Sequence, residues 1–219
     1  MIIVIPAINC EDFACVKERI QQAEIFLHRE DWVHIDVTDG AFTFNKTWNN
    51  PEEFGAWLGA RRDINCQTEI HLMTEESTGM AMRWLAVGAK RLVVHAETLS
   101  ADSAHEILDM TKRAGAEATL AFNPETNPEK FSEYSEGFKK FLVLAVYPGL
   151  AGQRFLPLIL DKIKFLRQKF PNAIIEVDGG MNPATAKLAK EAGANLIVAA
   201  SYVFGAKEPR KAYEELRNI

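Results

Sequence analysis

The sequence repeats one short pattern, in which an amphipathic stretch ends at a glycine flanked by small residues and an apolar run follows. Copies of this pattern centre on Gly88, Gly115 and Gly193. Glycine just after a helix is a common helix stop, because it enters the left-handed conformation without a steric penalty. Gly88 and Gly115 are 27 residues apart, and Gly115 and Gly193 are 78 apart, which is three steps of 26. The pattern therefore predicts strand–helix units of about 26 residues.

Eight units of this length account for the 219 residues of the chain. We expect strands near 2–6, 32–37, 67–72, 91–95, 118–122, 141–146, 174–178 and 195–199. We expect helices near 11–28, 52–61, 77–87, 101–114, 128–137, 155–169, 183–192 and 207–217. Three helix starts are marked by Asn-Pro pairs at Asn50, Asn127 and Asn182, where Asn caps the helix and Pro fills its first position.

The alternation of strands and helices predicts an α/β fold with a parallel sheet covered by helices. Eight repeats fit a closed (β/α)8 TIM barrel, a parallel eight-stranded barrel with outer helices, as a single domain over 1–219. The alternative is a doubly wound open sheet, which usually has fewer repeats and often a glycine-rich turn after its first strand. The turn at 6–10 reads Pro-Ala-Ile-Asn-Cys and has no glycine, so we expect the barrel.

The composition narrows the classes of partner. A net charge of −5, without a basic stripe, argues against a nucleic-acid-binding surface. The three cysteines are an odd number without CxxC spacing, which favours a reduced cytosolic protein over a disulfide-bonded secreted one. The apolar start at 1–6 is too short for a signal peptide or a membrane span. We therefore expect a soluble cytoplasmic protein with no nucleic-acid or membrane partner.

Four polar residues lie near the ends of apolar strands: His34, Asp36, His71 and Asp178. Residues two apart on a strand point to the same side, so His34 and Asp36 share a face. In a barrel the carboxyl ends of the strands form the active-site mouth, where all four side chains can converge. A single buried histidine is usually a hydrogen-bonded core residue, and an Asp before Gly-Gly is usually a turn residue. Four together predict a site for a divalent metal, and the donor set suits Zn²⁺, Fe²⁺, Mn²⁺ or Co²⁺ without choosing among them.

The remaining histidines are assigned by position. His95 ends the fourth expected strand, and we expect it to contact a metal ligand or the substrate rather than to bind the metal itself. His28 and His105 fall in expected helices and are predicted to lie on the surface.

Four segments in this order resemble the ribulose-phosphate 3-epimerase family, and the resemblance runs nearly end to end. They are 34–40 (His-Ile-Asp-Val-Thr-Asp-Gly), 69–73 (Glu-Ile-His-Leu-Met), 146–153 and 176–182. The resemblance implies a (β/α)8 barrel that inverts C3 of D-ribulose 5-phosphate to give D-xylulose 5-phosphate. It also implies a homo-oligomer.

The resemblance assigns roles to individual residues. A divalent metal ion would be held by His34, Asp36, His71 and Asp178. Asp36 and Asp178 would be the catalytic pair that moves the proton on the two faces of C3. The residues expected to contact the sugar phosphate are Asn9, His71, Met73, Gly149, Gly152, Gly179, Gly180 and Ser201.

The chain departs from the family around the substrate. Ala7 stands where the family has a serine that contacts the substrate, and Asn9, two positions on, is our candidate replacement. Thr38 and Leu144 stand where methionines are common, although Met73 is kept.

Two further departures affect the expected phosphate end, because Ala151 and Ala200 replace usual glycines. Alanine is tolerated there if φ is negative and is costly if φ is positive, and the sequence leaves both options open.

These departures leave two alternatives to the pentulose epimerase. One is an epimerase of a related ketose phosphate, such as a hexulose phosphate. The other is a non-catalytic metal-containing barrel that binds a sugar phosphate. The orotidine-phosphate decarboxylase and hexulose-phosphate synthase group uses an Asp-x-Lys-x-x-Asp signature, whereas Asp36-Val-Thr-Asp39 has no lysine, which argues against that group.

Overall fold

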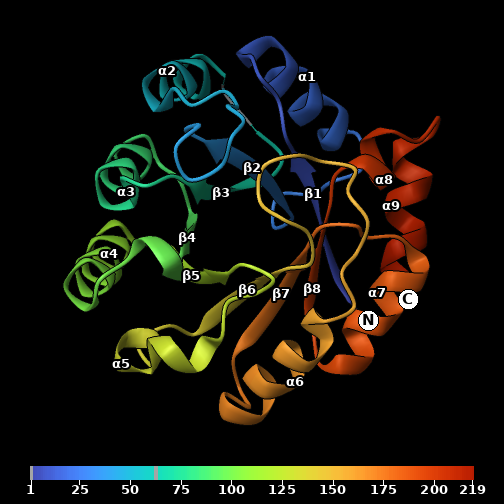
Figure 1. The fold of residues 1–219 in the computed structure, drawn as a ribbon. Coiled ribbons are helices and arrows are strands. Elements are labelled where there is room, and N and C mark those ends of the chain that lie inside the picture. The colour runs from blue at the N-terminus through green and yellow to red at the C-terminus, as the bar shows by residue number, and fades with distance from the viewer. Residues whose placement is uncertain (1, 62–63) are drawn as a thin grey trace.

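A computed structural model describes residues 2–61 and 64–219, and the strands in this part of the chain close into a parallel barrel (Figure 1). Neighbouring strands pair in chain order, and β8 pairs with β1 to close the ring. The strands are β1 (Ile3–Ile8), β2 (Trp32–Thr38), β3 (Gln67–Met73), β4 (Arg91–His95), β5 (Glu117–Phe122), β6 (Lys140–Leu144), β7 (Ile174–Asp178) and β8 (Leu196–Ala199). The predicted (β/α)8 barrel is confirmed.

The helices form a ring outside the strands (Figure 1). They are α1 (Phe13–Glu24), α2 (Pro51–Ala60), α3 (Ser77–Ala86), α4 (Ala101–Ala114), α5 (Ser132–Ser135), α6 (Ile159–Lys169), α7 (Pro183–Ala192), α8 (Ser201–Phe204) and α9 (Pro209–Arg217). Two 3₁₀ turns, η1 (Ala96–Thr98) and η2 (Pro128–Phe131), follow β4 and precede α5. Helix faces and the outer faces of the strands bury one continuous apolar core, with Trp84 and Phe54 among its largest members.

Several helices begin or end at the capping residues predicted from the sequence. Asn50, Asn127 and Asn182 each accept a backbone N–H at the start of the following helix or 3₁₀ turn, with Pro at the first position. Gly115 and Gly193 end α4 and α7 with φ of 63° and 116°, in the left-handed region that favours glycine.

Several boundaries differ from the sequence prediction. The helix expected over 11–28 covers only Phe13–Glu24, because Asp12 caps it and the chain turns at its end, so His28 lies in an exposed loop. His105 lies exposed on α4, as expected. The helix expected over 128–137 divides into η2 and the single turn α5.

The inside of the barrel holds two separate apolar clusters, and buried polar residues come from the strands between them. Ile5, Ala7, Leu196 and Val198 form an apolar cluster on β1 and β8. A second cluster on β4, β5 and β6 consists of Val93, Ala121, Leu142 and Leu144. The buried histidines and carboxylates come from the remaining inward positions, chiefly on β2, β3 and β7.

The cysteines do not follow the expectation of a reduced chain. Cys10 and Cys15 form a disulfide with a Cα–Cα distance of 5.8 Å, and Cys66 is free and buried. The turn capped by Asp12 brings the two cysteines together at the start of α1, and the spacing of five residues belongs to no motif that the sequence analysis used. Within residues 2–61 and 64–219, no helix is long and apolar enough to cross a bilayer.

Candidate active site

Four side chains meet at the carboxyl ends of β2, β3 and β7. His34 Nε2 lies 3.1 Å from Asp36 Oδ1 and 3.1 Å from His71 Nδ1. His71 Nδ1 lies 3.2 Å from Asp36 Oδ1 and 3.8 Å from Asp178 Oδ2. Each of the four residues offers one ligand atom, and these atoms all lie within 4.8 Å of one another. The structure thus brings together the whole predicted ligand set.

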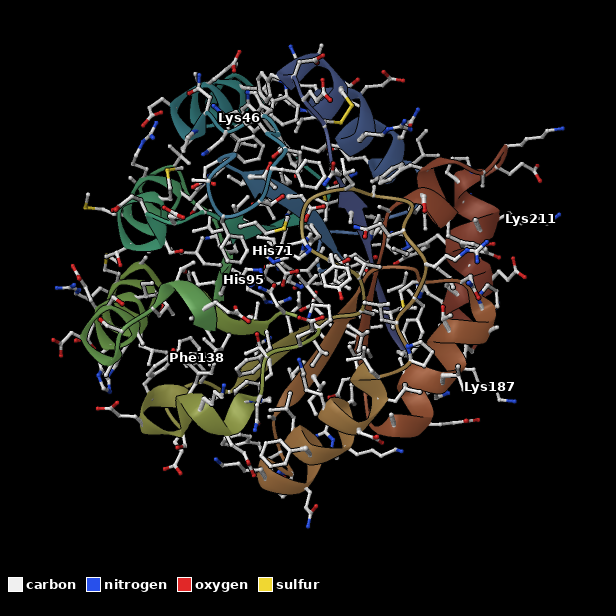
Figure 2. The ribbon with its side chains drawn as sticks, in the orientation of Figure 1. Lys46, His71, His95, Phe138, Lys187 and Lys211 are labelled. Atoms are coloured by element: carbon white, nitrogen blue, oxygen red, sulfur yellow. A yellow bond between two sulfur atoms is a disulfide. The ribbon has the colours of Figure 1, made fainter. Side chains whose placement is uncertain are left out.

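The hydrogen bonds around His71 leave a lone pair pointing at this cluster. His95 Nδ1 lies 3.1 Å from the Glu97 carboxylate and donates to it, so His95 Nε2 is an acceptor when the ring is neutral. His71 Nε2 lies 2.9 Å from His95 Nε2 and therefore donates to it. His71 Nδ1 is then bare, although it lies against a carboxylate oxygen that also has no hydrogen. Figure 2 shows His71 and His95 together inside the ring of strands.

The Glu69 carboxylate has the same effect on His34. His34 Nδ1 donates to Glu69 Oε1 at 2.7 Å, and Glu69 in turn accepts from Arg91 at 2.8 Å. This leaves Nε2 to face the cluster. Fixing a histidine through its second ring nitrogen is the usual way that proteins orient a metal ligand.

Burial and mutual hydrogen bonds shift the pKa values of the two histidines in opposite directions. Burial, reinforced by the neighbouring His34, lowers the pKa of His71 to about 4, so this ring is neutral. Burial alone would also lower the pKa of His34, but hydrogen bonds and charges from Asp36 and Glu69 hold it well above its usual value. The carboxylates of this cluster thus favour positive charge beside them. A divalent cation would supply positive charge at the same atoms, and the residues present fit such an ion.

The two candidate proton-transfer carboxylates, Asp36 and Asp178, have widely different pKa values. Burial raises the pKa of Asp36, yet the hydrogen bond from His34 and the charge of that ring outweigh this and hold it well below the usual range. Burial and then the nearby charge of Asp36 raise the pKa of Asp178 to about 7. Paired carboxylates with separated pKa values are suited to acid and base roles in one reaction.

The predicted contact residues line one pocket above the ligand cluster. Its wall is formed by Asn9, Asp36, Met73, Leu144, Val146, Tyr147, Pro148, Gly149, Leu150, Ala151, Gly152, Gln153, Asp178, Gly179, Gly180, Met181, Val198, Ala200 and Ser201. Of the residues expected to contact sugar phosphate, all except the fully buried His71 appear in this wall. The structure therefore gathers the predicted residues in one place, and their individual roles remain predictions.

Two pocket glycines are required by close packing. Gly149 has φ of 121°, and a Cβ there would lie 2.2 Å from Asn45 Oδ1. Gly180 has φ of 65°, and a Cβ there would lie 2.5 Å from the Phe155 nitrogen. No non-glycine residue in the described part of the chain has positive φ, so neither Ala151 nor Ala200 occupies the left-handed conformation that favours glycine.

The segment between β6 and α6 crosses the mouth of the barrel (Figure 1). Its Gly149 carbonyl accepts hydrogen bonds from Asn9 Nδ2 at 3.0 Å and from Asn45 Nδ2 at 2.9 Å. The expected helix over 155–169 begins only at Ile159, because Leu156 instead donates its N–H to the Ala145 carbonyl.

The acidic residues beneath the ligand cluster were not predicted from the sequence. Glu69 and Glu176 are buried two residues before His71 and Asp178, so they lie on the same face of their strands. Arg91 balances Glu69 and also bonds Glu117 at 2.8 Å. The available signal was a charged residue inside an apolar strand, two positions from a candidate ligand.

Taken together, these features define a (β/α)8 barrel with a candidate divalent-metal centre and two carboxylates below a glycine-lined pocket. The family model for the ribulose-phosphate 3 epimerase family matches residues 3–204. The chain belongs to this family.

Curated relatives are similar over nearly their full length. Ribulose-phosphate 3-epimerase of Bacillus subtilis is 34% identical over 224 residues, covering 99% of both chains. The enzyme of Chlamydia muridarum is 34% identical over 209 residues, covering 93% of this chain and 88% of the relative. The cytoplasmic isoform of Oryza sativa is 34% identical over 190 residues, covering 85% of this chain and 81% of the relative.

Solved structures with more distant sequences share the fold. The 3-hexulose-6-phosphate synthase of Salmonella typhimurium gives a TM-score of 0.73 at 13% identity, covering 99% of this chain and 97% of that one. KGPDC from Streptococcus mutans gives a TM-score of 0.70 at 11% identity, covering 100% of this chain and 96% of that one. At this identity the likeness concerns the barrel alone.

Proposed function

We propose that the chain is an isomerase that interconverts D-ribulose 5-phosphate and D-xylulose 5-phosphate by inverting C3. The observation that carries this proposal is the placement of Asp36 and Asp178 at the floor of one pocket, on β2 and β7. Inversion needs a proton acceptor on one face of the carbon and a donor on the other. Two carboxylates brought to one pocket from separate strands supply this pair, and family membership supports the same reaction.

The chain's own residues divide the work. In one direction Asp36 takes the proton from C3 and Asp178 delivers a proton to the opposite face, and the roles reverse in the other direction. His34, Asp36, His71 and Asp178 would hold a divalent cation. That ion, when bound, supplies positive charge that stabilises the negative charge developing on the substrate oxygens. The choice among Zn²⁺, Fe²⁺, Mn²⁺ and Co²⁺ stays open, because the donor set suits each of them.

The phosphate group is assigned to the glycine side of the pocket. Gly179 and Gly180 follow β7 with positive φ, and Ser201 stands at the entry to α8. Backbone N–H groups of such turns are suited to binding an anion. Gly149 and Gly152, both with positive φ, lie across the pocket in the segment that spans the mouth.

The test is isotope exchange at C3. The metal-replete protein is incubated in D₂O with D-ribulose 5-phosphate, and in parallel with a hexulose phosphate, and deuterium at C3 is followed by NMR. We expect incorporation together with formation of D-xylulose 5-phosphate. Exchange only with the hexulose phosphate would assign the related ketose instead. Binding of both sugars without any exchange would assign a non-catalytic binding protein.

We also propose a cytoplasmic homo-oligomer. The location is supported by the Oryza sativa relative, which is named as a cytoplasmic isoform. Fractionation of the source cells and light scattering of the purified chain test the two parts separately.

A further inference from the structure

Asn9 lies in the loop after β1 and contacts two functional parts of the molecule. Its side-chain nitrogen donates to Asp36 Oδ2 at 3.0 Å and to the Gly149 carbonyl at 3.0 Å. A primary amide has two hydrogens, so these two bonds use its entire donor capacity. The sequence predicted a direct substrate contact for Asn9, but both amide hydrogens are already engaged within the chain.

The two oxygens of Asp36 have different partners. Oδ1 faces His34 Nε2 at 3.1 Å and His71 Nδ1 at 3.2 Å, within the ligand cluster. Oδ2 accepts from Asn9 instead. A carboxylate bonded at both oxygens cannot rotate about its Cβ–Cγ bond without breaking one set of contacts. Asn9 therefore fixes which oxygen meets the ligands and which meets the pocket.

The segment over the mouth is tied to the same amide. Gly149 accepts from Asn9 and from Asn45, which lies in the loop after β2. The amide nitrogen of Asn45 bonds this carbonyl, and its amide oxygen accepts from the Thr43 hydroxyl at 2.7 Å. Two asparagines, Asn9 and Asn45, therefore donate to the Gly149 carbonyl. Only Asn9 also donates to the Asp36 carboxylate.

We propose that Asn9 is a positioning residue, which keeps Asp36 Oδ1 on the ligand cluster and aims Oδ2 into the pocket for proton transfer. Because the same amide holds Gly149, this orientation is linked to the seating of the segment over the mouth. The inference rests on the proposed function, for which Asp36 must move a proton.

The experiment compares Asn9→Leu with Asn45→Leu. Both changes replace the amide by an apolar side chain of similar size and remove one hydrogen bond from the Gly149 carbonyl. We expect amide hydrogen exchange over 147–153 to rise in both variants, and KM to rise in both. Only Asn9→Leu is expected to lower kcat, by about 10- to 100-fold, because a carboxylate displaced by about 1 Å loses its alignment with C3.

A second readout does not depend on turnover. The visible spectrum of the Co²⁺-loaded protein reports the arrangement of its ligands, and a freed Asp36 carboxylate changes that arrangement. We expect the spectrum to change in Asn9→Leu and to stay as in the wild type in Asn45→Leu. Asn9→Ala, which removes the amide and leaves a smaller side chain, is measured in the same way. Thermal melting identifies any variant that fails to fold.

Equal kcat values and equal spectra in the two leucine variants would overturn the proposal, because Asn9 would then act only through the segment over the mouth. An unchanged kcat in both Asn9 variants would overturn it as well. Failure of the proposed function is distinguishable, since it appears as absence of C3 exchange in the wild type. In that case the Co²⁺ spectra still decide whether Asn9 orients Asp36.

Discussion

His34 and His71 turn different ring nitrogens toward Asp36, and each is held in place through the nitrogen that remains. Glu69 occupies Nδ1 of His34, whereas His95 occupies Nε2 of His71 and is itself held by Glu97. The orientation of the two rings is therefore a property of their buried acidic neighbours. His34 Nε2 and His71 Nδ1 face the cluster only while those neighbours keep the two rings in this orientation.

The Glu97 carboxylate, which holds His95, makes the stability of the folded chain depend on pH. Burial raises the pKa of Glu97, but its hydrogen bonds with His95, Thr126 and the Asn123 N–H lower it to about 2, against an ordinary value of 4.5. A depressed pKa in the folded chain stabilises that state above pH 4.5, and the stabilisation is lost as pH falls toward 2. The shift corresponds to about 3 kcal/mol.

The check is the difference in the free energy of unfolding between the wild type and Glu97→Gln, measured by denaturant titration. We expect the wild type to be more stable above pH 4.5 and the difference to shrink steadily between pH 4.5 and pH 2. A difference that does not vary over this interval would contradict the assignment of Glu97 as a buried carboxylate that holds His95.

The N-terminal cap of α7 marks the end of a loop that lines the pocket. Asn182 accepts from the N–H groups of Ala184 and Thr185 at the start of α7, directly after the Gly179-Gly180 turn. We expect Asn182→Ala to lower the free energy of unfolding by about 1 kcal/mol, because two backbone donors lose their acceptor. Thermal denaturation measures this as a fall in Tm of roughly 2–4 °C.

The matched control is Asn172→Ala, an exposed asparagine in the turn before β7. It is expected to change the free energy of unfolding by less than about 0.5 kcal/mol. Equal losses in the two variants would show that the cap at Asn182 contributes nothing beyond the surface.

The elements that the sequence predicted well are those with a local chemical signal. The 26-residue repeat located every strand described here to within about two residues, since apolar runs and helix-stopping glycines depend on neighbouring residues alone. The fifth helix was overestimated, because the Ser- and Glu-rich segment after η2 sustains only one turn. The late start of α6 could not be read locally. It follows from contacts across the molecule, where the Phe155 backbone packs on Gly180 and Leu156 bonds Ala145.

The candidate site was also predicted only in part. The four ligand residues stand at strand ends and share the chemistry of metal ligands, so the barrel geometry was enough to group them. The buried layer beneath them was missed, because Glu69 finds its counterion in Arg91 on the next strand. Such a pairing is set by strand register, which the sequence pattern does not give.

On the scale of the whole molecule, the ligand cluster joins strands that lie apart around the barrel. Its atoms come from β2, β3 and β7, and β1 and β8 lie between β2 and β7 in the closed ring. A cation bound there favours the folded barrel over the unfolded chain, which has no preformed site. We expect a concentration of free Co²⁺ or Zn²⁺ about 100 times the Kd to add about 2.7 kcal/mol to the free energy of unfolding.

This gain in the free energy of unfolding appears as a rise in Tm of roughly 5–10 °C when the metal is added, and a chelator reverses it. The control is Asp178→Asn, in which one ligand oxygen becomes an amide and the rise is expected to be smaller. A Tm that does not respond to any of the four candidate metals would contradict the metal centre.

The central claim is that Asp36 and Asp178 share the proton transfer, each serving as the base for one of the two epimers. The most direct measurement is deuterium incorporation at C3 from D₂O, followed separately from D-ribulose 5-phosphate and D-xylulose 5-phosphate in metal-loaded Asp36→Asn and Asp178→Asn. We predict that neither variant epimerises, and that each loses exchange with a different one of the two sugars. Epimerisation at the wild-type rate in both variants, or loss of exchange with the same sugar in both, would contradict the account.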